Sequence, residues 1–100
     1  MKLVRDRIPE IIFQSGKQCK WHEANFQELK ESLYKKLDEE LQEFIENPSQ
    51  EEAADMYEVL RTICWLHQIS MESVIEHASY KRSSKGGFHE GIILEEVEGG

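Results

Sequence analysis

The chain has 100 residues, of which 12 are basic and 20 acidic, giving a formal net charge of −8. The length predicts a single domain over residues 1–100, and 39% apolar residues suffice for one modest core. The acidic balance excludes a general nucleic-acid binder, because such a chain repels phosphates. No apolar run approaches the roughly 20 residues that a membrane span needs. Two cysteines without a CxxC spacing favour a reducing, cytoplasmic location.

Capping signals at the start of the chain predict two helices and a loop between them. The first helix begins with Asp6 as its N-cap and stops at Gly16. Residues 17–24 show no helical or strand period and are expected to form a loop. The second helix covers residues 25–46, because Asn25 stands at a capping-box position and an Asn-Pro pair follows the helix.

The second half of the chain predicts two more helices and a short tail. Ser49 caps a third helix that runs to about residue 67, and Ser70 caps a fourth that ends at the glycine pair 86–87. The tail Phe88–Val97 alternates weakly between apolar and polar residues, which predicts one short strand. Short connections make the later helices antiparallel neighbours, so the predicted fold is all-α with a short extended C-terminal tail.

The angular positions of the acids show which of them face the core, since helical residues advance by about 100° each. On the second predicted helix, Glu40 lies inside the apolar arc and Glu43 on its border, whereas Glu46 points the other way. On the third, Glu52 lies in the middle of the apolar arc and Asp55 on its edge. These acids therefore project toward the side on which the two helices pack.

The short turn between the two helices brings both pairs of acids level with each other. Four carboxylates in a partly apolar place repel one another, so that protons or cations must neutralise them. Oxygen ligands without a nearby Cys or His suit Mg²⁺, with Mn²⁺ as a possible substitute. The alternative interpretation is a solvated acidic helix face that binds nothing.

Two motifs in this region resemble the signature of a known superfamily. The sequence reads EExxE over residues 39–43 and ExxD over residues 52–55. In this order the motifs resemble those of the all-α nucleoside triphosphate pyrophosphohydrolases, which include MazG, the dimeric dUTPases and phosphoribosyl-ATP pyrophosphohydrolase. The opening LVRDRIP at residues 3–9, the pair Lys36-Leu37, and Lys81 with KGGF at residues 85–88 are similar to the small phosphoribosyl-ATP-pyrophosphohydrolase-like branch.

The resemblance implies a MazG-like fold with four helices around an antiparallel helical hairpin. It also implies hydrolysis between the α- and β-phosphates of a (d)NTP, which yields a monophosphate and pyrophosphate. By the family pattern Glu40, Glu43, Glu52 and Asp55 hold Mg²⁺. The catalytic residues are then Glu39 and Glu40, with Glu39 helping to orient the attacking water.

Basic residues at three places are candidates for binding the phosphates. The resemblance implies this role for Lys81 and Lys85, although Lys85 stands where the branch commonly has Arg, which alone offers a bidentate fork. Both lysines also suit the C-terminal end of a helix. Lys36 either contacts phosphate or pairs with Glu40 one turn away. The segment Arg5-Asp6-Arg7 reaches a substrate, reaches a subunit interface, or only caps a helix.

The sequence leaves three functions open. The leading one is a Mg²⁺-dependent pyrophosphohydrolase that removes unwanted nucleoside triphosphates. The alternatives are a non-catalytic helical interaction module of the same fold and a phosphoribosyl-ATP pyrophosphohydrolase. Family members complete their sites with neighbouring subunits, which implies a homodimer or a higher homo-oligomer. The acidic charge and the lack of a long apolar run predict no membrane or nucleic-acid polymer as partner.

Overall fold

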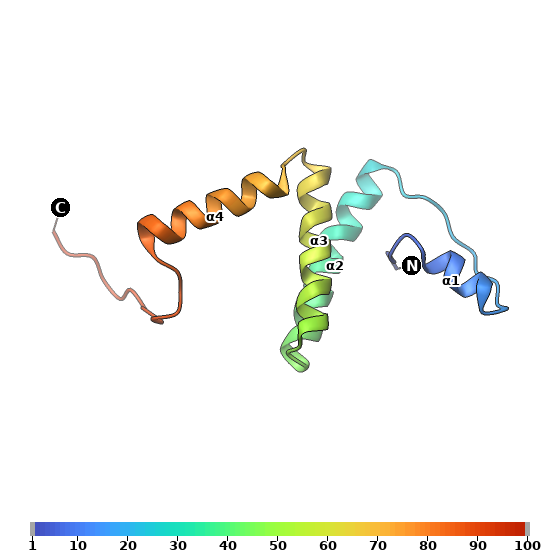
Figure 1. Cartoon of the computed structure of the whole chain (residues 1–100), viewed down its shortest axis with the longest axis horizontal. Helices are drawn as coiled ribbons and strands as arrows, with labels where there is room; N and C mark the ends of the chain where they lie inside the picture. Colours follow the sequence, from blue (N-terminus) through green and yellow to red (C-terminus); the bar gives the residue numbers. More distant parts are fainter. Residues whose placement is uncertain (1, 100) are drawn as a thin grey trace. The chain divides into compact units, whose positions relative to one another are not determined.

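A computed structural model describes residues 2–99, which contain four helices and no strand. The helices are α1 (Ile8–Gln14), α2 (Phe26–Glu46), α3 (Gln50–Leu66) and α4 (Met71–Lys85) (Figure 1). The chain divides into two compact units, one up to Gln68 with α1 to α3 and one from Ile69 onward with α4. The predicted all-α class is thus confirmed. Within the described residues, no helix combines the length and apolar character needed to cross a bilayer.

The starts of α2 and α3 agree with the capping signals in the sequence. The Asn25 side chain accepts a hydrogen bond from the Glu28 backbone N–H at 2.9 Å. The Ser49 hydroxyl likewise accepts one from the Glu52 backbone N–H at 3.2 Å. Each cap satisfies a backbone donor that has no partner inside its helix. The cap on α3 also fixes where Glu52 stands in the first turn.

The helices α2 and α3 form an antiparallel hairpin joined by residues 47–49, and they lie side by side in Figure 1. Its buried apolar side chains, among the described residues, are Leu33, Val59 and Cys64. Glu40 is buried with them. A hydrogen bond of 2.6 Å between Tyr34 Oη and His67 Nε2 links the first half of α2 to the C-cap residue of α3. The core is therefore small, and a charged residue belongs to it.

The first helix begins one residue later than predicted. Arg7, not Asp6, is the N-cap residue, and no side chain caps the helix. The Ile8 backbone N–H donates to the Arg5 carbonyl at 3.0 Å, so a turn through residues 5–8 leads into the helix. This turn satisfies one of the backbone donors of the first helical turn without a capping side chain. The helix ends close to the predicted stop, and Gly16 follows with a φ of +87°.

The second unit contains α4 and an irregular tail. Ser70 caps α4 as predicted, accepting from the Ser73 backbone N–H at 3.4 Å, and Gly86 ends it with a φ of +87°. The strand predicted at Phe88–Val97 was wrong, because this segment has no regular structure. A strand needs a neighbour to pair its backbone groups. Over residues 2–99 no second strand exists to supply one.

Candidate functional site

Three carboxylates from the two hairpin helices converge beside the core. One oxygen each from Glu40 on α2 and from Glu52 and Asp55 on α3 lie within 4.8 Å of one another. Glu52 and Asp55 are spaced one helical turn apart, so they share a face of α3. Glu40 faces them because it lies on the packing side of α2, where the predicted apolar arc placed it. We call these three residues the carboxylate cluster.

Two oxygens of this cluster are buried without a partner. Oε2 of Glu40 and Oε2 of Glu52 are inaccessible to solvent and accept no hydrogen bond from the described residues. Glu40 as a whole is only 6% exposed. A buried acceptor without a partner is costly, and natural structures satisfy nearly all of them. The two orphan oxygens therefore point to a proton or a cation as the missing partner.

The electrostatics of Glu52 agree with this. Burial raises the pKa of its carboxyl group above the ordinary value, and the neighbouring charges of Glu43, Asp55 and Glu40 raise it further. A hydrogen bond that protonated Glu52 shares with Glu43 acts in the same direction. The ionised form of Glu52 is thus unfavourable unless positive charge is added nearby.

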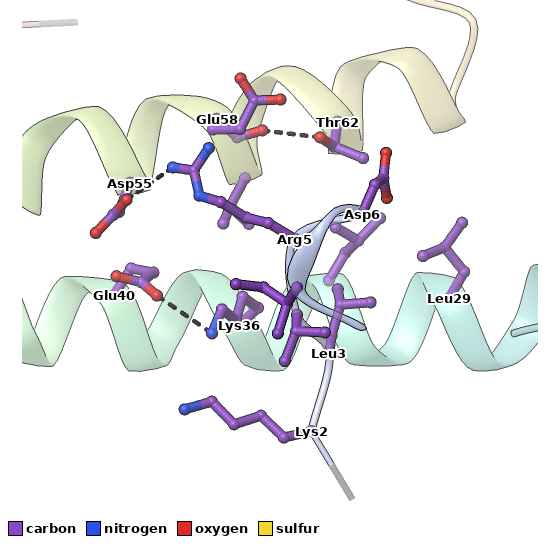
Figure 2. A pocket seen from close by; sticks show the side chains of 14 residues that line it. Lys2, Leu3, Arg5, Asp6, Leu29, Lys36, Glu40, Asp55, Glu58 and Thr62 are labelled. Atoms are coloured by element: carbon purple, nitrogen blue, oxygen red, sulfur yellow. Dashed lines mark hydrogen bonds and ion pairs between the residues drawn. The ribbon is translucent and has the colours of Figure 1, made fainter. Parts of the chain in front are cut away.

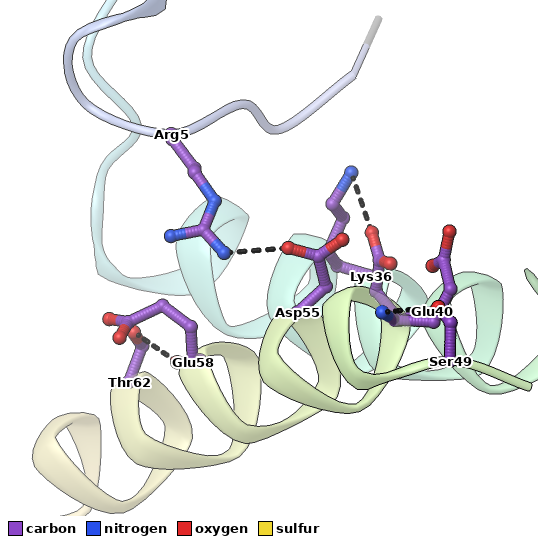
Figure 3. Close-up of polar contacts among 8 residues, drawn as sticks. Arg5, Lys36, Glu40, Ser49, Asp55, Glu58 and Thr62 are labelled. Carbon is purple, nitrogen blue, oxygen red and sulfur yellow. Dashed lines mark hydrogen bonds and ion pairs between the residues drawn. The ribbon is translucent and has the colours of Figure 1, made fainter. Parts of the chain in front are cut away.

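Two cationic side chains already supply part of this charge. Lys36 Nζ lies 3.4 Å from Glu40 Oε1, and this lysine side chain is 19% exposed. Arg5 Nη2 lies 2.7 Å from Asp55 Oδ1. Figure 3 shows Arg5 reaching the cluster from the beginning of the chain, while Lys36 approaches from α2. Of the two interpretations of Lys36, the pairing with Glu40 is confirmed, and phosphate binding stays a prediction.

A pocket of about 420 Å³ opens next to the cluster (Figure 2). Its walls come from the beginning of the chain, from α2 and from α3. One part of the lining is apolar, with Leu3, Leu29, Leu33 and Val59 among its residues. The polar part brings together cations and acids, namely Lys2, Arg5, Lys36, Asp6, Glu40, Asp55 and Glu58. Its volume and mixed lining are those of a small-molecule site.

The structure separates the predicted site residues into three groups. Glu40, Glu52 and Asp55 come together, with Lys36 beside them. Glu43, predicted as a fourth ligand, is exposed and stands outside the group of three, although it is near enough to raise the pKa of Glu52.

The other three predicted residues are not among the three clustered acids. Glu39 on α2 is half-buried. Lys81 and Lys85 are exposed in the last turns of α4, within the second unit, so their role at the site stays a prediction.

Sequence reasoning left the place of Arg5 open and did not single out Lys2 or Glu58. The signal for Arg5 was its position in the opening LVRDRIP segment, but nothing local connects that segment with Asp55, 50 residues later. Glu58 lies one turn after Asp55 on α3, so it lines the pocket on the same side of that helix. Both residues line the pocket because of how the beginning of the chain folds back.

The donor atoms of the carboxylate cluster fit a hard divalent cation. All of them are carboxylate oxygens, and Glu40 and Glu52 each have one buried oxygen without a partner. Mg²⁺ and Mn²⁺ prefer such ligands, whereas Zn²⁺ prefers sites with His or Cys. Comparison with known protein families, with curated proteins and with solved structures finds no match.

Proposed function

We propose that this chain is a Mg²⁺-dependent nucleoside triphosphate pyrophosphohydrolase of MazG-like fold. It would cleave the anhydride between the α- and β-phosphates of (d)NTPs, releasing a monophosphate and pyrophosphate in the cytoplasm. The observation that carries the proposal is the carboxylate cluster with its two buried, unpartnered oxygens, which lies beside a pocket of suitable size. The order of the EExxE and ExxD motifs supports the same reaction.

The acidic residues of the site would have two roles, binding the cation and orienting the attacking water. Glu40, Glu52 and Asp55 would hold the cation, and the exposed Glu43 would join them as its fourth acid. A divalent cation held there would neutralise phosphate charge and lower the pKa of water for attack at neutral pH. Glu39 would orient the attacking water.

Cationic side chains supply the contacts to the phosphates. Lys36 lies at the edge between the cluster and the pocket, so it can attract a phosphate while it stays paired with Glu40. The family resemblance also assigns phosphate binding to Lys81 and Lys85, at the end of α4.

The test is an assay of the purified chain with Mg²⁺ against a panel of NTPs, dNTPs and phosphoribosyl-ATP, with pyrophosphate and orthophosphate measured separately. We expect pyrophosphate and monophosphate in equal amounts. Glu52→Gln should reduce the rate by more than about 100-fold, which exceeds the usual effect of residues that only orient a ligand. Glu46→Gln is the matched control, since Glu46 is exposed on α2 and outside the cluster.

Every other outcome of this assay would indicate a different function or refute the assigned site. Orthophosphate as the product would mean that a different bond is cut. Hydrolysis of phosphoribosyl-ATP alone would assign the narrower activity. A folded protein that binds Mg²⁺ and releases no product from any nucleotide would favour a non-catalytic module of the same fold. Equal losses in Glu46→Gln and Glu52→Gln would refute the assignment of the cluster.

We also propose that the chain works as a homodimer or a higher homo-oligomer. Large apolar side chains on α2 and α3 stay exposed in the single chain, including Phe26 at 60%, Ile45 at 58% and Trp65 at 68%. A hairpin with so small a core gains from covering such surface with a second copy. Light scattering at micromolar concentration should therefore give at least twice the mass of the chain, and a stable monomer would refute this proposal.

A further inference from the structure

The beginning of the chain lies over the candidate site as a short strap, which we define as residues 2–8. Six of its seven residues line the pocket. Leu3 and Ile8 are half-buried, whereas Arg5 is exposed over 60% of its side chain. Figure 2 shows Leu3 near the middle of α2 and Arg5 directed at Asp55. The strap thus has apolar attachment points and a long, exposed cation between them.

We infer that Arg5 exchanges partners during the working cycle of this site. It pairs with Asp55 while the cluster lacks a divalent cation, and it turns to the polyphosphate of the substrate once Asp55 binds the cation. The inference rests on the proposed function, because it takes a divalent cation and a polyphosphate as the ligands. It adds a substrate-binding residue outside the EExxE and ExxD motifs.

The first part of the exchange follows from competition for one carboxylate. The guanidinium lies 2.7 Å from Asp55 Oδ1, and Asp55 also contributes an oxygen to the cluster. A divalent cation bound among the three carboxylates repels the positive guanidinium and lowers the charge that attracts it. The pair is largely exposed, so little stability opposes its release.

The second part follows from the charges around the pocket. Lys2, Arg5 and Lys36 line it, facing the acids Asp6, Glu40, Asp55 and Glu58. Without a divalent cation these acids outnumber the cations, so the pocket repels phosphates. A divalent cation bound to the cluster gives the positive charges in the pocket a majority. It also releases the Arg5 guanidinium, whose fork of N–H groups matches the bidentate geometry of phosphate oxygens.

The exchange of partners predicts that the variant Arg5→Gln binds the metal more tightly and the polyphosphate more weakly. In Arg5→Gln no guanidinium competes with the cation for Asp55. This variant should therefore bind Mn²⁺ about two- to fivefold more tightly than the wild type, the range expected for losing an exposed ion pair. The same variant, with saturating Mg²⁺, should bind inorganic tripolyphosphate about tenfold more weakly, as expected for a lost charge-assisted contact. Titration calorimetry measures both affinities, and tripolyphosphate avoids any dependence on the base.

Two further variants separate charge, geometry and general effects. Arg7→Gln is the matched control, because Arg7 pairs with Glu10 at 3.2 Å and does not line the pocket. Its affinities for Mn²⁺ and tripolyphosphate should equal those of the wild type. Arg5→Lys keeps the charge and loses the fork, so it should bind Mn²⁺ like the wild type and tripolyphosphate more weakly than it.

The inference is overturned if Arg5→Gln binds Mn²⁺ no more tightly than the wild type, or tripolyphosphate equally well. This failure differs from failure of the proposed function. If the wild type binds no Mn²⁺, or if Glu52→Gln still releases pyrophosphate, the metal site itself is wrong. If the wild type hydrolyses nucleotides through Glu52 while Arg5→Gln matches it in both titrations, only the exchange by Arg5 is wrong.

Discussion

Replacing Lys36 with methionine tests whether Glu40 is a buried charge that needs a partner. Glu40 is 6% exposed, and its Oε1 lies 3.4 Å from Lys36 Nζ. Methionine keeps the apolar stem of the lysine and removes only its charge. The substitution leaves Glu40 without its cation in a partly apolar place. We therefore expect Lys36→Met to destabilise the metal-free protein.

The magnitude follows from the geometry of the pair. At 3.4 Å and an effective dielectric of about 20, the attraction between the two charges is about 5 kcal/mol. The lysine side chain is 19% exposed, so solvent screens part of this. Breaking a buried pair by removing one partner typically costs roughly 3–5 kcal/mol. We expect Lys36→Met to lower the free energy of unfolding by about 3 kcal/mol.

The assay is urea unfolding in the presence of EDTA, followed by circular dichroism of the helices. Lys35→Met is the control, since Lys35 is exposed on the same helix and belongs to no ion pair among the described residues. It should change the free energy of unfolding by less than about 0.5 kcal/mol. The double variant Lys36→Met/Glu40→Gln should regain most of the loss, because the uncompensated charge is then gone.

Adding Mg²⁺ supplies a second check on the same reasoning. The cation replaces the missing lysine charge, so it should stabilise Lys36→Met through mass action. The need of Glu40 for a countercharge is refuted if Lys36→Met is as stable as the wild type, or if the double variant is no more stable than Lys36→Met. Either result would mean that Glu40 is well solvated and requires no countercharge.

Two other predictions follow from the hairpin. The folded-state pKa of Glu52 lies above its ordinary value of 4.5, so the folded chain takes up this proton more readily than the unfolded chain. The resulting stability is fully present below pH 4.5 and is lost as the pH rises through the raised pKa. In EDTA, the free energy of unfolding of Glu52→Gln relative to the wild type should therefore grow with pH over this window, and a flat difference would contradict the shift. Leu33→Ala should lower the free energy of unfolding by about 2–5 kcal/mol, because Leu33 is 3% exposed in the core. Leu41→Ala, at a site 39% exposed, should cost less than about 1 kcal/mol in the same urea titration, and equal losses would contradict the assigned core.

The features that depend on nearby residues were predictable from the sequence. Asn25, Ser49 and Ser70 cap their helices where expected, because a capping hydrogen bond spans only three residues. The positions of Glu40, Glu52 and Asp55 in the cluster follow from the helical repeat and a short turn. These acids face one another because both helices keep their period up to the turn between them.

The features that depend on distant segments required the tertiary structure. The tail at Phe88–Val97 has strand-like alternation and forms no strand, since pairing with another strand is decided outside the segment. Arg5 and Asp55 are 50 residues apart, and no local pattern states that they meet. Their contact arises because the strap folds back over the α2–α3 hairpin and covers its small core. Helical periodicity thus determines where the acids of the site lie. The folding back of the strap determines that Arg5 is the cation that pairs with Asp55.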